Sequence, residues 1–266
     1  MDAFVNEQDF TLLTQDRYTF SVLDRILRGK CDWVRSDHQD LILCHSETPY
    51  PVWVWTRDGC GTEIMEEAWN IIAVDRPLTE GYRFNMKYAL AAYFMDKAKQ
   101  MNLNAGIAMN LFAYDCPSPI CPEHAVDGKL YCCTKEDAEQ AAEMIFAFYA
   151  AIEEEMSAPE RCMEKAMTYI DGHAFFFWLN ASDVPVACCS YKCNQGMASL
   201  GSVYTCPEYR RRHYAQQLVY QVTEIVKKKG YLPILYTDAD YPASNACYEK
   251  VGYRLRGRLC TVSLQK

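Results

Sequence analysis

Three consecutive arginines, Arg210, Arg211 and Arg212, stand between a predicted strand and a predicted helix. The strand ends near Thr205, a turn containing Pro207 follows, and the helix opens at the arginines. Arginine at a helix N-terminus is unfavourable for the helix itself, because the macrodipole is positive at that end. Backbone N–H groups, the helix dipole and guanidinium groups together bind anions. The segment therefore predicts a phosphate or pyrophosphate site, with a solvated basic turn as the alternative.

A second candidate segment follows the next predicted strand and contains Asn245 and Tyr248. Because these two residues are three positions apart, they share one face of a short predicted helix. The helix directs Tyr248 toward the end of the strand that precedes it. The alternative is structural: the Tyr248 ring packs in the core, and Asn245 caps the turn.

Together, and in this order, the two segments resemble the GNAT superfamily of N-acetyltransferases. The strand end at 203–205, followed by residues 207–210, is similar to the approach to that family's acetyl-CoA pyrophosphate loop, whose pattern is Gln/Arg-x-x-Gly-x-Gly/Ala. Arg210 takes the first position of the pattern and Ala215 the last. The family's C-terminal signature is matched closely by the run Ser244-Asn245-x-x-Tyr248-Glu249-x-x-Gly252-Tyr253.

The loop departs from the family pattern at two positions. His213 stands at the loop glycine, and Arg211 stands where relatives often have glycine. Glycine lets a backbone approach a pyrophosphate closely. A histidine there narrows the cradle or adds a donor to phosphate, so we expect the departure to affect cofactor affinity more than the fold.

The resemblance implies acetyl-CoA as the acyl-donor substrate and direct attack of an amine on its thioester. Backbone N–H groups of Val203 and Thr205 would hydrogen-bond the pantetheine arm and polarise the thioester. Tyr248 would protonate the departing thiolate, since a phenol keeps its proton at pH 7. The residues that the resemblance implies for cofactor binding are Val203, Tyr204, Thr205, Arg210, Arg211, Arg212, His213, Tyr214, Ala215 and Asn245.

The sequence leaves the general base and the acceptor site open. Asp238 ends the strand beside the Asn245 segment and is our candidate base, with Glu208 and a chain of water molecules as alternatives. The acidic run 153–155 lies between two predicted helices, where this family often shapes its acceptor site. It would attract a cationic amine, although a solvated helix end is the simpler interpretation.

A cysteine-rich segment raises the alternative of a zinc cluster. Cys116, Cys121 and His124 lie close together in sequence, with Cys132 and Cys133 nearby. The spacings Cys-x4-Cys and Cys-x2-His do not match a common paired Cys-x-x-Cys pattern. We therefore expect no metal.

Hydrophobic periodicity and turn signals predict the elements that position these residues. The predicted fold class is α/β: a mixed, mostly antiparallel sheet flanked by helices. Residues 129–266 follow the GNAT order of elements. The predicted strands are 130–134, 173–179, 184–191, 197–205, 233–237 and 253–264, and the predicted helices are 135–155, 159–170, 212–229 and 243–250.

The proline-rich segment 115–128 reads as a linker and divides the chain into domains 1–125 and 126–266. The first domain loosely mirrors the second, and we interpret it as a degenerate GNAT-like domain in which Leu78–Arg83 replaces the arginine loop. Its predicted helices are 11–28, 62–70 and 84–101, and its predicted strands are 41–45, 51–56 and 105–114.

The composition is that of an ordinary globular protein: of 266 residues, 50% are apolar and 23% charged, which excludes a disordered or collagen-like chain. No apolar run reaches the roughly 20 residues of a membrane span, and no signal-peptide pattern opens the chain. We therefore expect a cytoplasmic protein whose 14 cysteines are mostly buried thiols. Residues 1–125 carry 11 basic and 18 acidic side chains, and residues 126–266 carry 16 and 17.

These observations favour an acetyl-CoA-dependent N-acetyltransferase that acts on a small amine or a peptide amino group. An acidic chain with one basic cluster suits a small anionic ligand better than nucleic acid. The expected partners are acetyl-CoA and the amine, with a homodimer allowed and neither nucleic acid nor membrane. The rival hypotheses are a catalytically silent acyl-CoA-binding or regulatory protein and a zinc-dependent interaction module.

Overall fold

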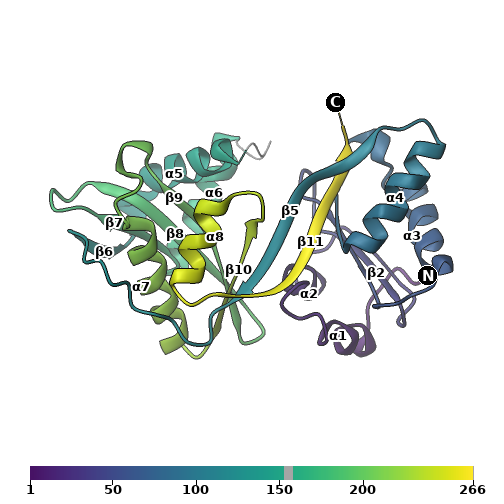
Figure 1. Cartoon of the computed structure of the whole chain (residues 1–266), viewed down its shortest axis with the longest axis horizontal. Coiled ribbons are helices and arrows are strands. Elements are labelled where there is room, and N and C mark those ends of the chain that lie inside the picture. The colour runs from purple at the N-terminus through teal and green to yellow at the C-terminus, as the bar shows by residue number, and fades with distance from the viewer. Residues whose placement is uncertain (153–157, 266) are drawn as a thin grey trace. The chain divides into compact units, whose positions relative to one another are not determined.

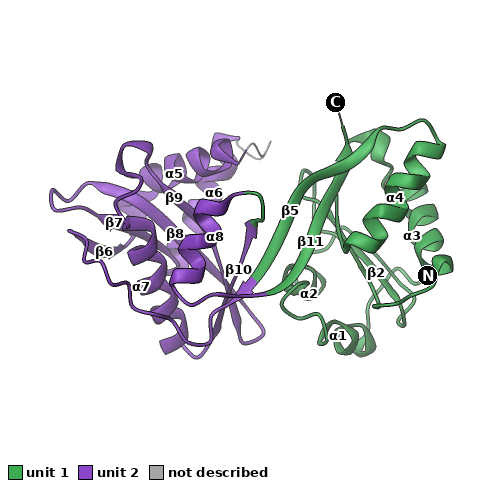
Figure 2. Ribbon diagram, in the orientation of Figure 1, with its two compact units in different colours: residues 1–113, 238–240, 256–266 green, residues 114–237, 241–255 purple. Residues whose placement is uncertain are grey.

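The computed structural model describes residues 1–152 and 158–265 and divides the chain into two compact units (Figure 2). Unit 1 comprises residues 1–113, 238–240 and 256–266. Unit 2 comprises residues 114–237 and 241–255. The chain therefore starts in unit 1, builds most of unit 2 and returns to unit 1 with its last strand.

Unit 1 contains a mostly antiparallel sheet with the strand order β1-β2-β3-β4-β11-β5. Strands β2, β11 and β5 of this sheet are labelled in Figure 1. Strands β3 and β4 run parallel, while the pairs β1-β2, β2-β3 and β4-β11 are antiparallel. Its helices are α1 (Glu7–Leu13), α2 (Ser21–Arg28), α3 (Thr62–Asp75) and α4 (Tyr88–Gln100). Its strands are β1 (Trp33–Ser36), β2 (Leu41–His45), β3 (Val52–Thr56), β4 (Phe84–Met86), β5 (Ala105–Asp115) and β11 (Arg254–Leu264), the last two reaching into unit 2 at one end.

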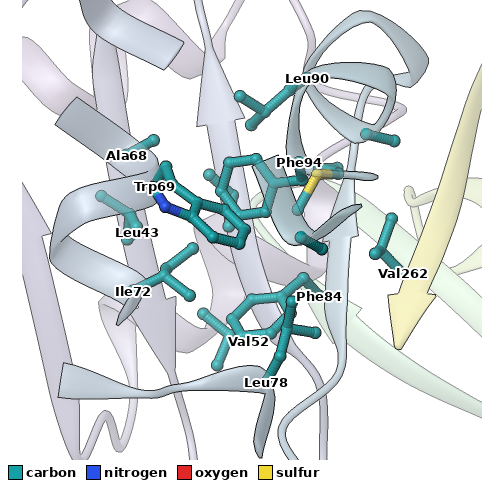
Figure 3. Close-up of a cluster of buried hydrophobic side chains, with 14 of the residues drawn as sticks. Leu43, Val52, Ala68, Trp69, Ile72, Leu78, Phe84, Leu90, Phe94 and Val262 are labelled. Carbon is teal, nitrogen blue, oxygen red and sulfur yellow. The ribbon is translucent and has the colours of Figure 1, made fainter. Parts of the chain in front are cut away.

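The core of unit 1 lies between its sheet and helices α3 and α4 (Figure 3). Trp69 of α3 meets Phe94 of α4 edge to face, with ring centroids 5.2 Å apart. Val52 faces this core from β3, whereas its neighbour Trp53 packs against Phe20 on the opposite side. Because successive side chains of a strand point to opposite faces, these two contacts cover both faces of β3.

Unit 2 has the strand order β10-β9-β8-β7-β6, antiparallel except for the parallel pair β9-β10. Helices α5 and α6 share a core with Phe175 and Phe177 of β7. Phe176 points to the other face and stacks on Tyr191, which Lys229 at the end of α7 contacts. The elements are β6 (Lys129–Cys132), α5 (Ala138–Ala151), α6 (Pro159–Asp171), β7 (Phe175–Leu179), β8 (Pro185–Asn194), β9 (Met197–Thr205), α7 (Tyr214–Lys228), β10 (Leu232–Asp238) and α8 (Pro242–Lys250).

Two predicted helices differ from the observed elements, and one observed strand was not predicted. The predicted helix 11–28 is two helices, because a capping box formed by Asn6 and Asp9 starts α1 earlier and Thr14 ends it. The predicted helix 84–101 opens as strand β4, whose three residues are all buried in the sheet, and becomes helical only at Tyr88. Strand β1 was not predicted at all.

The last predicted strand, 253–264, was assigned to the second domain, but its residues from 256 onward lie in unit 1. There Thr261 pairs with Asn85 of β4, and their side chains share a buried hydrogen bond of 2.7 Å. Sequence order does not reveal which unit the last strand joins, because the pattern of residues in the strand is the same in either sheet. The domain boundaries 1–125 and 126–266 stay a prediction.

The two units repeat one arrangement, a strand, a helix and a parallel strand: β3-α3-β4 in unit 1 and β9-α7-β10 in unit 2. The counterpart of α7 is therefore α3, and the counterpart of the arginine loop is the segment 57–61 instead of Leu78–Arg83. In unit 1, Lys87 Nζ donates to the carbonyl of Thr56, at the end of β3, over 2.9 Å. A side chain of the same unit thus covers this strand end.

Candidate active site

The first part of the candidate site is the end of β9, where this strand separates from β10. The parallel register between them ends at Leu200 opposite Leu235. Strand β9 continues to Thr205 paired with β8 alone, past a register shift near Ser202, which has a left-handed φ of +49°. The β10-side edge of residues 203–205 therefore lies outside the β9-β10 ladder, as binding of an extended ligand along that edge requires.

The second part is the loop from Arg210 to Ala215, which leads into α7. Arg211 and His213 both have φ +63°, the left-handed conformation that glycine adopts most easily. The two positions where the sequence departs from the glycine pattern thus keep a glycine-like backbone. His213 is the N-cap of α7 and forms no side-chain cap. The first N–H groups of any helix have no intrahelical acceptor, and here the N-cap side chain does not accept from them either, so they can bind an anion.

The three arginines precede this helix end in the chain, and their side chains are exposed. Arg210 is fixed to the strand, since its Nε donates to the Thr205 carbonyl over 3.2 Å. The Arg210 guanidinium lies 5.8 Å from the centre of the Tyr204 ring, and that of Arg212 lies 5.6 Å from the Tyr209 ring. The predicted phosphate loop therefore combines a positive helix end with cations that are partly held in place.

Two residues of the predicted linker also contact this loop, and sequence reasoning missed both. The Tyr214 hydroxyl donates to the carboxylate of Asp127, and the imidazole of His124 lies 4.6 Å from that of His213 between ring centroids. The hydrogen bond from Tyr214 lowers the pKa of Asp127 and raises the pKa of Tyr214. The sequence gave no signal for these contacts, because the segment 115–128 has no hydrophobic periodicity from which its position could be predicted.

The third part is α8, which carries Asn245 and Tyr248 on one buried face. Tyr248 is 7% exposed, and burial raises the pKa of its phenol well above the ordinary value. Its ring meets that of Tyr253 edge to face, and the Tyr253 hydroxyl is 2.8 Å from Thr223 Oγ1. Among the described residues the Tyr248 hydroxyl has no hydrogen-bond partner. The phenol therefore keeps its proton and has its donor capacity unused.

The candidate bases lie in different places. Asp238 ends β10 and is grouped with unit 1, where its carboxylate accepts a hydrogen bond of 2.8 Å from the backbone N–H of Asp240. Glu208 is exposed in a short 3-10 turn, Pro207–Tyr209. Neither environment marks one of them as the base. The acidic run 153–155 lies outside the described residues.

The cysteines of the zinc hypothesis make other contacts. Cys116 Sγ lies 3.7 Å from the Val251 carbonyl, and Cys121 Sγ lies 3.8 Å from the carbonyl of Pro122. In the part of the chain that the structure describes, no cluster of three or more His, Cys, Asp or Glu side chains suits a metal ion. Every helix in that part also falls short of the length and apolarity needed to cross a bilayer.

Comparison with known proteins agrees with this geometry. Residues 137–253 match the model of the acetyltransferase (GNAT) family. No curated protein matches the chain. Among solved structures, a GNAT-family acetyltransferase from Colwellia psychrerythraea is similar over 99% of both chains, with a TM-score of 0.59 and 12% identity.

Two other solved structures are similar over most of both units. A GCN5-related N-acetyltransferase from Kribbella flavida has a TM-score of 0.62 and 13% identity, over 94% of this chain and 95% of its own. A tandem GNAT protein from the clavulanic acid biosynthesis pathway has a TM-score of 0.55 and 14% identity, over 89% and 85%. Identities this low show the fold alone.

Residues 137–253 are therefore a GNAT acetyltransferase domain, and they contain every predicted cofactor-binding residue. The expected α/β architecture with a mostly antiparallel sheet is confirmed, and the likeness to a tandem GNAT protein extends the fold to much of the chain. Acyl transfer is the activity that this family supports.

Proposed function

We propose that this protein transfers the acetyl group of acetyl-CoA to a primary amine of a small molecule or peptide. The observation that carries the proposal is the loop 210–215. It keeps a glycine-like backbone at Arg211 and His213 and has three exposed arginines just before the N-terminus of α7, within a GNAT domain. A pyrophosphate needs this combination of backbone N–H groups and cations. These residues fit the phosphates of coenzyme A.

Acetyl-CoA supplies an activated acyl thioester, and the chain supplies position and protons. The loop and its arginines bind the phosphates. Backbone N–H groups of Val203 and Thr205, on the edge outside the β9-β10 ladder, orient the pantetheine arm and the thioester carbonyl. The Tyr248 hydroxyl holds the proton that the leaving thiolate takes up, and burial keeps that proton on the phenol. Holding the amine beside the thioester supplies much of the remaining acceleration.

We propose Asp238 as the base that accepts the proton of the attacking amine, either directly or through water. A cytoplasmic location and a homodimer also remain proposals. Replacing Asp238 with Asn tests the base: we expect the rate to fall most below the pKa of the amine, where the amine must still lose a proton. A pH-rate profile that stays unchanged would leave Glu208 or water in that role.

The decisive experiment combines calorimetry of coenzyme A binding with thiol release from acetyl-CoA over a panel of amines. The wild type is compared with the double variant Arg210→Gln/Arg212→Gln, and Lys228→Gln serves as a control at the far end of α7. We expect binding and turnover in the wild type and in the control, and weak binding in the double variant. Absence of coenzyme A binding by the wild type would overturn the proposal.

The second candidate function is a catalytically silent acyl-CoA-binding or regulatory protein. The observation that favours it is the presence of the bulky side chains of Arg211 and His213 where relatives often have glycine. Tight coenzyme A binding without thiol release on any amine would establish this function instead.

A further inference from the structure

The segment that the sequence presents as a linker is fixed to unit 2 at Asp127. The backbone carbonyl of Asp127 accepts a hydrogen bond of 2.9 Å from Trp178 Nε1. Its carboxylate Oδ2 accepts another of 2.9 Å from the backbone N–H of Ala181. The next residue, Gly128, has φ +93°, and a Cβ added there would lie 1.9 Å from the Leu179 carbonyl oxygen. This close approach holds Asp127 against the end of β7.

The same carboxylate reaches the phosphate loop. Its other oxygen, Oδ1, accepts the hydrogen bond from Tyr214, the first residue of α7, whose side chain is 5% exposed. Tyr214 lies between His213 and Ala215, inside the predicted loop. One carboxylate therefore joins the end of β7 to the N-terminus of α7. The ring of His124, three residues before Asp127, lies on the ring of His213 and supports the loop at a second point.

Electrostatics alone would make this carboxylate unfavourable. An anion beside a loop that binds phosphates repels the ligand, since Coulomb interactions between neighbouring charges are significant at a protein surface. The loop also contains two non-glycine residues in the left-handed region, which cost about 1 kcal/mol or more each. A rigid contact that holds the strained loop in one conformation offsets both effects, because a preorganised site loses less entropy on binding.

We propose that Asp127 is a positioning residue that acts through Tyr214 and holds the phosphate loop in the conformation that binds coenzyme A. The inference rests on the proposed function and deepens it. A charge effect and a positioning effect of Asp127 predict opposite changes in coenzyme A affinity when the carboxylate is neutralised. If its charge mattered most, neutralising it would strengthen anion binding; if its position matters most, neutralising it weakens binding.

The test uses the full-length variants Asp127→Asn, Tyr214→Phe and the double variant, with Asp171→Asn as the control. Asp171 is exposed and pairs with Lys135 at the far end of α6. Calorimetry with coenzyme A is expected to show about tenfold weaker binding in each single variant, the loss of one charge-assisted hydrogen bond. The double variant should bind coenzyme A no more weakly than the single variants, because both substitutions act on the same contact between Tyr214 and Asp127. KM for acetyl-CoA should rise while kcat stays within about twofold.

The outcomes separate this inference from the proposed function. Equal or tighter coenzyme A binding by Asp127→Asn, beside normal binding by the wild type, would overturn the positioning role and leave the acetyltransferase intact. Failure of the wild type to bind would overturn the proposed function. Hydrogen exchange of the amides of 211–217 without ligand tests the anchor by itself: we expect faster exchange in Asp127→Asn than in Asp171→Asn, and equal rates would overturn the anchor.

Discussion

Arg211 and His213 show how single residues can leave a family pattern while the backbone keeps it. Both have φ +63°, and Arg212 between them is not in the left-handed region. The left-handed conformation costs a residue with a Cβ roughly 1–2 kcal/mol, part of which glycine avoids. The sequence departure at these positions is thus a cost in stability with the loop geometry retained.

We predict that His213→Gly raises the free energy of unfolding by about 0.5–1 kcal/mol, because glycine relieves the strain but loses more entropy on folding. Urea denaturation measures the change. Arg212→Gly is the matched control in the same loop and should destabilise the protein, since no left-handed strain is relieved there. A destabilised His213→Gly would show that the imidazole contact with His124 outweighs the strain.

If Tyr248 is the acid, turnover depends on its hydroxyl and not on the packing of its ring. We predict that Tyr248→Phe lowers kcat about a hundredfold and leaves coenzyme A affinity nearly unchanged, because the ring still packs on Tyr253. Tyr241→Phe is the control, since Tyr241 is 54% exposed one residue before α8. Steady-state kinetics with calorimetry separates the two effects, and an unchanged kcat would remove Tyr248 as the acid.

At the scale of elements, the position of β11 is the feature that sequence order conceals. Its residues Cys260 and Val262 are fully buried in the core of unit 1, beside Phe84 of β4. Leu255, on the same strand, is 39% exposed and grouped with unit 2. One strand therefore contributes to a core built mainly by residues 1–113.

We predict that Val262→Ala destabilises unit 1 by about 2 kcal/mol, through the cavity that the lost methyl groups leave. Tryptophan fluorescence in urea reports on it, since Trp33, Trp53, Trp55 and Trp69 belong to unit 1 and only Trp178 to unit 2. Leu255→Ala is the control and should leave the transition within about 0.5 kcal/mol. Equal effects of both substitutions would contradict the assignment of the C-terminal strand to the core of unit 1.

At the scale of the whole molecule, the net charge is distributed differently between the two compact units than between the two halves of the sequence. Counted by sequence halves, the excess negative charge lies almost entirely in residues 1–125. Counted by units, unit 1 has 18 acidic and 14 basic side chains and unit 2 has 17 and 13, a net charge of −4 each. The difference arises mainly because β11 carries Arg256 and Arg258 into unit 1, while Asp115 and Glu123 belong to unit 2. Net charge therefore does not distinguish the two units, and we expect the local arginines to attract an anionic ligand.

We predict that coenzyme A affinity falls about tenfold between about 50 and about 500 mM KCl, because salt screens the exposed arginines of the loop. The dependence of coenzyme A affinity on KCl concentration should be weaker in Arg210→Gln/Arg212→Gln and unchanged in Lys228→Gln. Calorimetry over the salt series measures both. An identical slope in the arginine variant would show that the overall field, and not the cluster, attracts the ligand.

The sequence by itself determined the elements of unit 2, the fold class and the family, because periodicity, turn residues and motif spacing are local properties of the chain. The cofactor-binding, acid and base residues were also selected from sequence, and their roles stay predictions. Only the tertiary structure decided that Arg211 and His213 keep a left-handed backbone, that Asp127 and His124 contact residues of the loop 210–215, and that the last strand completes unit 1. These features depend on contacts between residues far apart in the chain, and such contacts leave no pattern in one sequence.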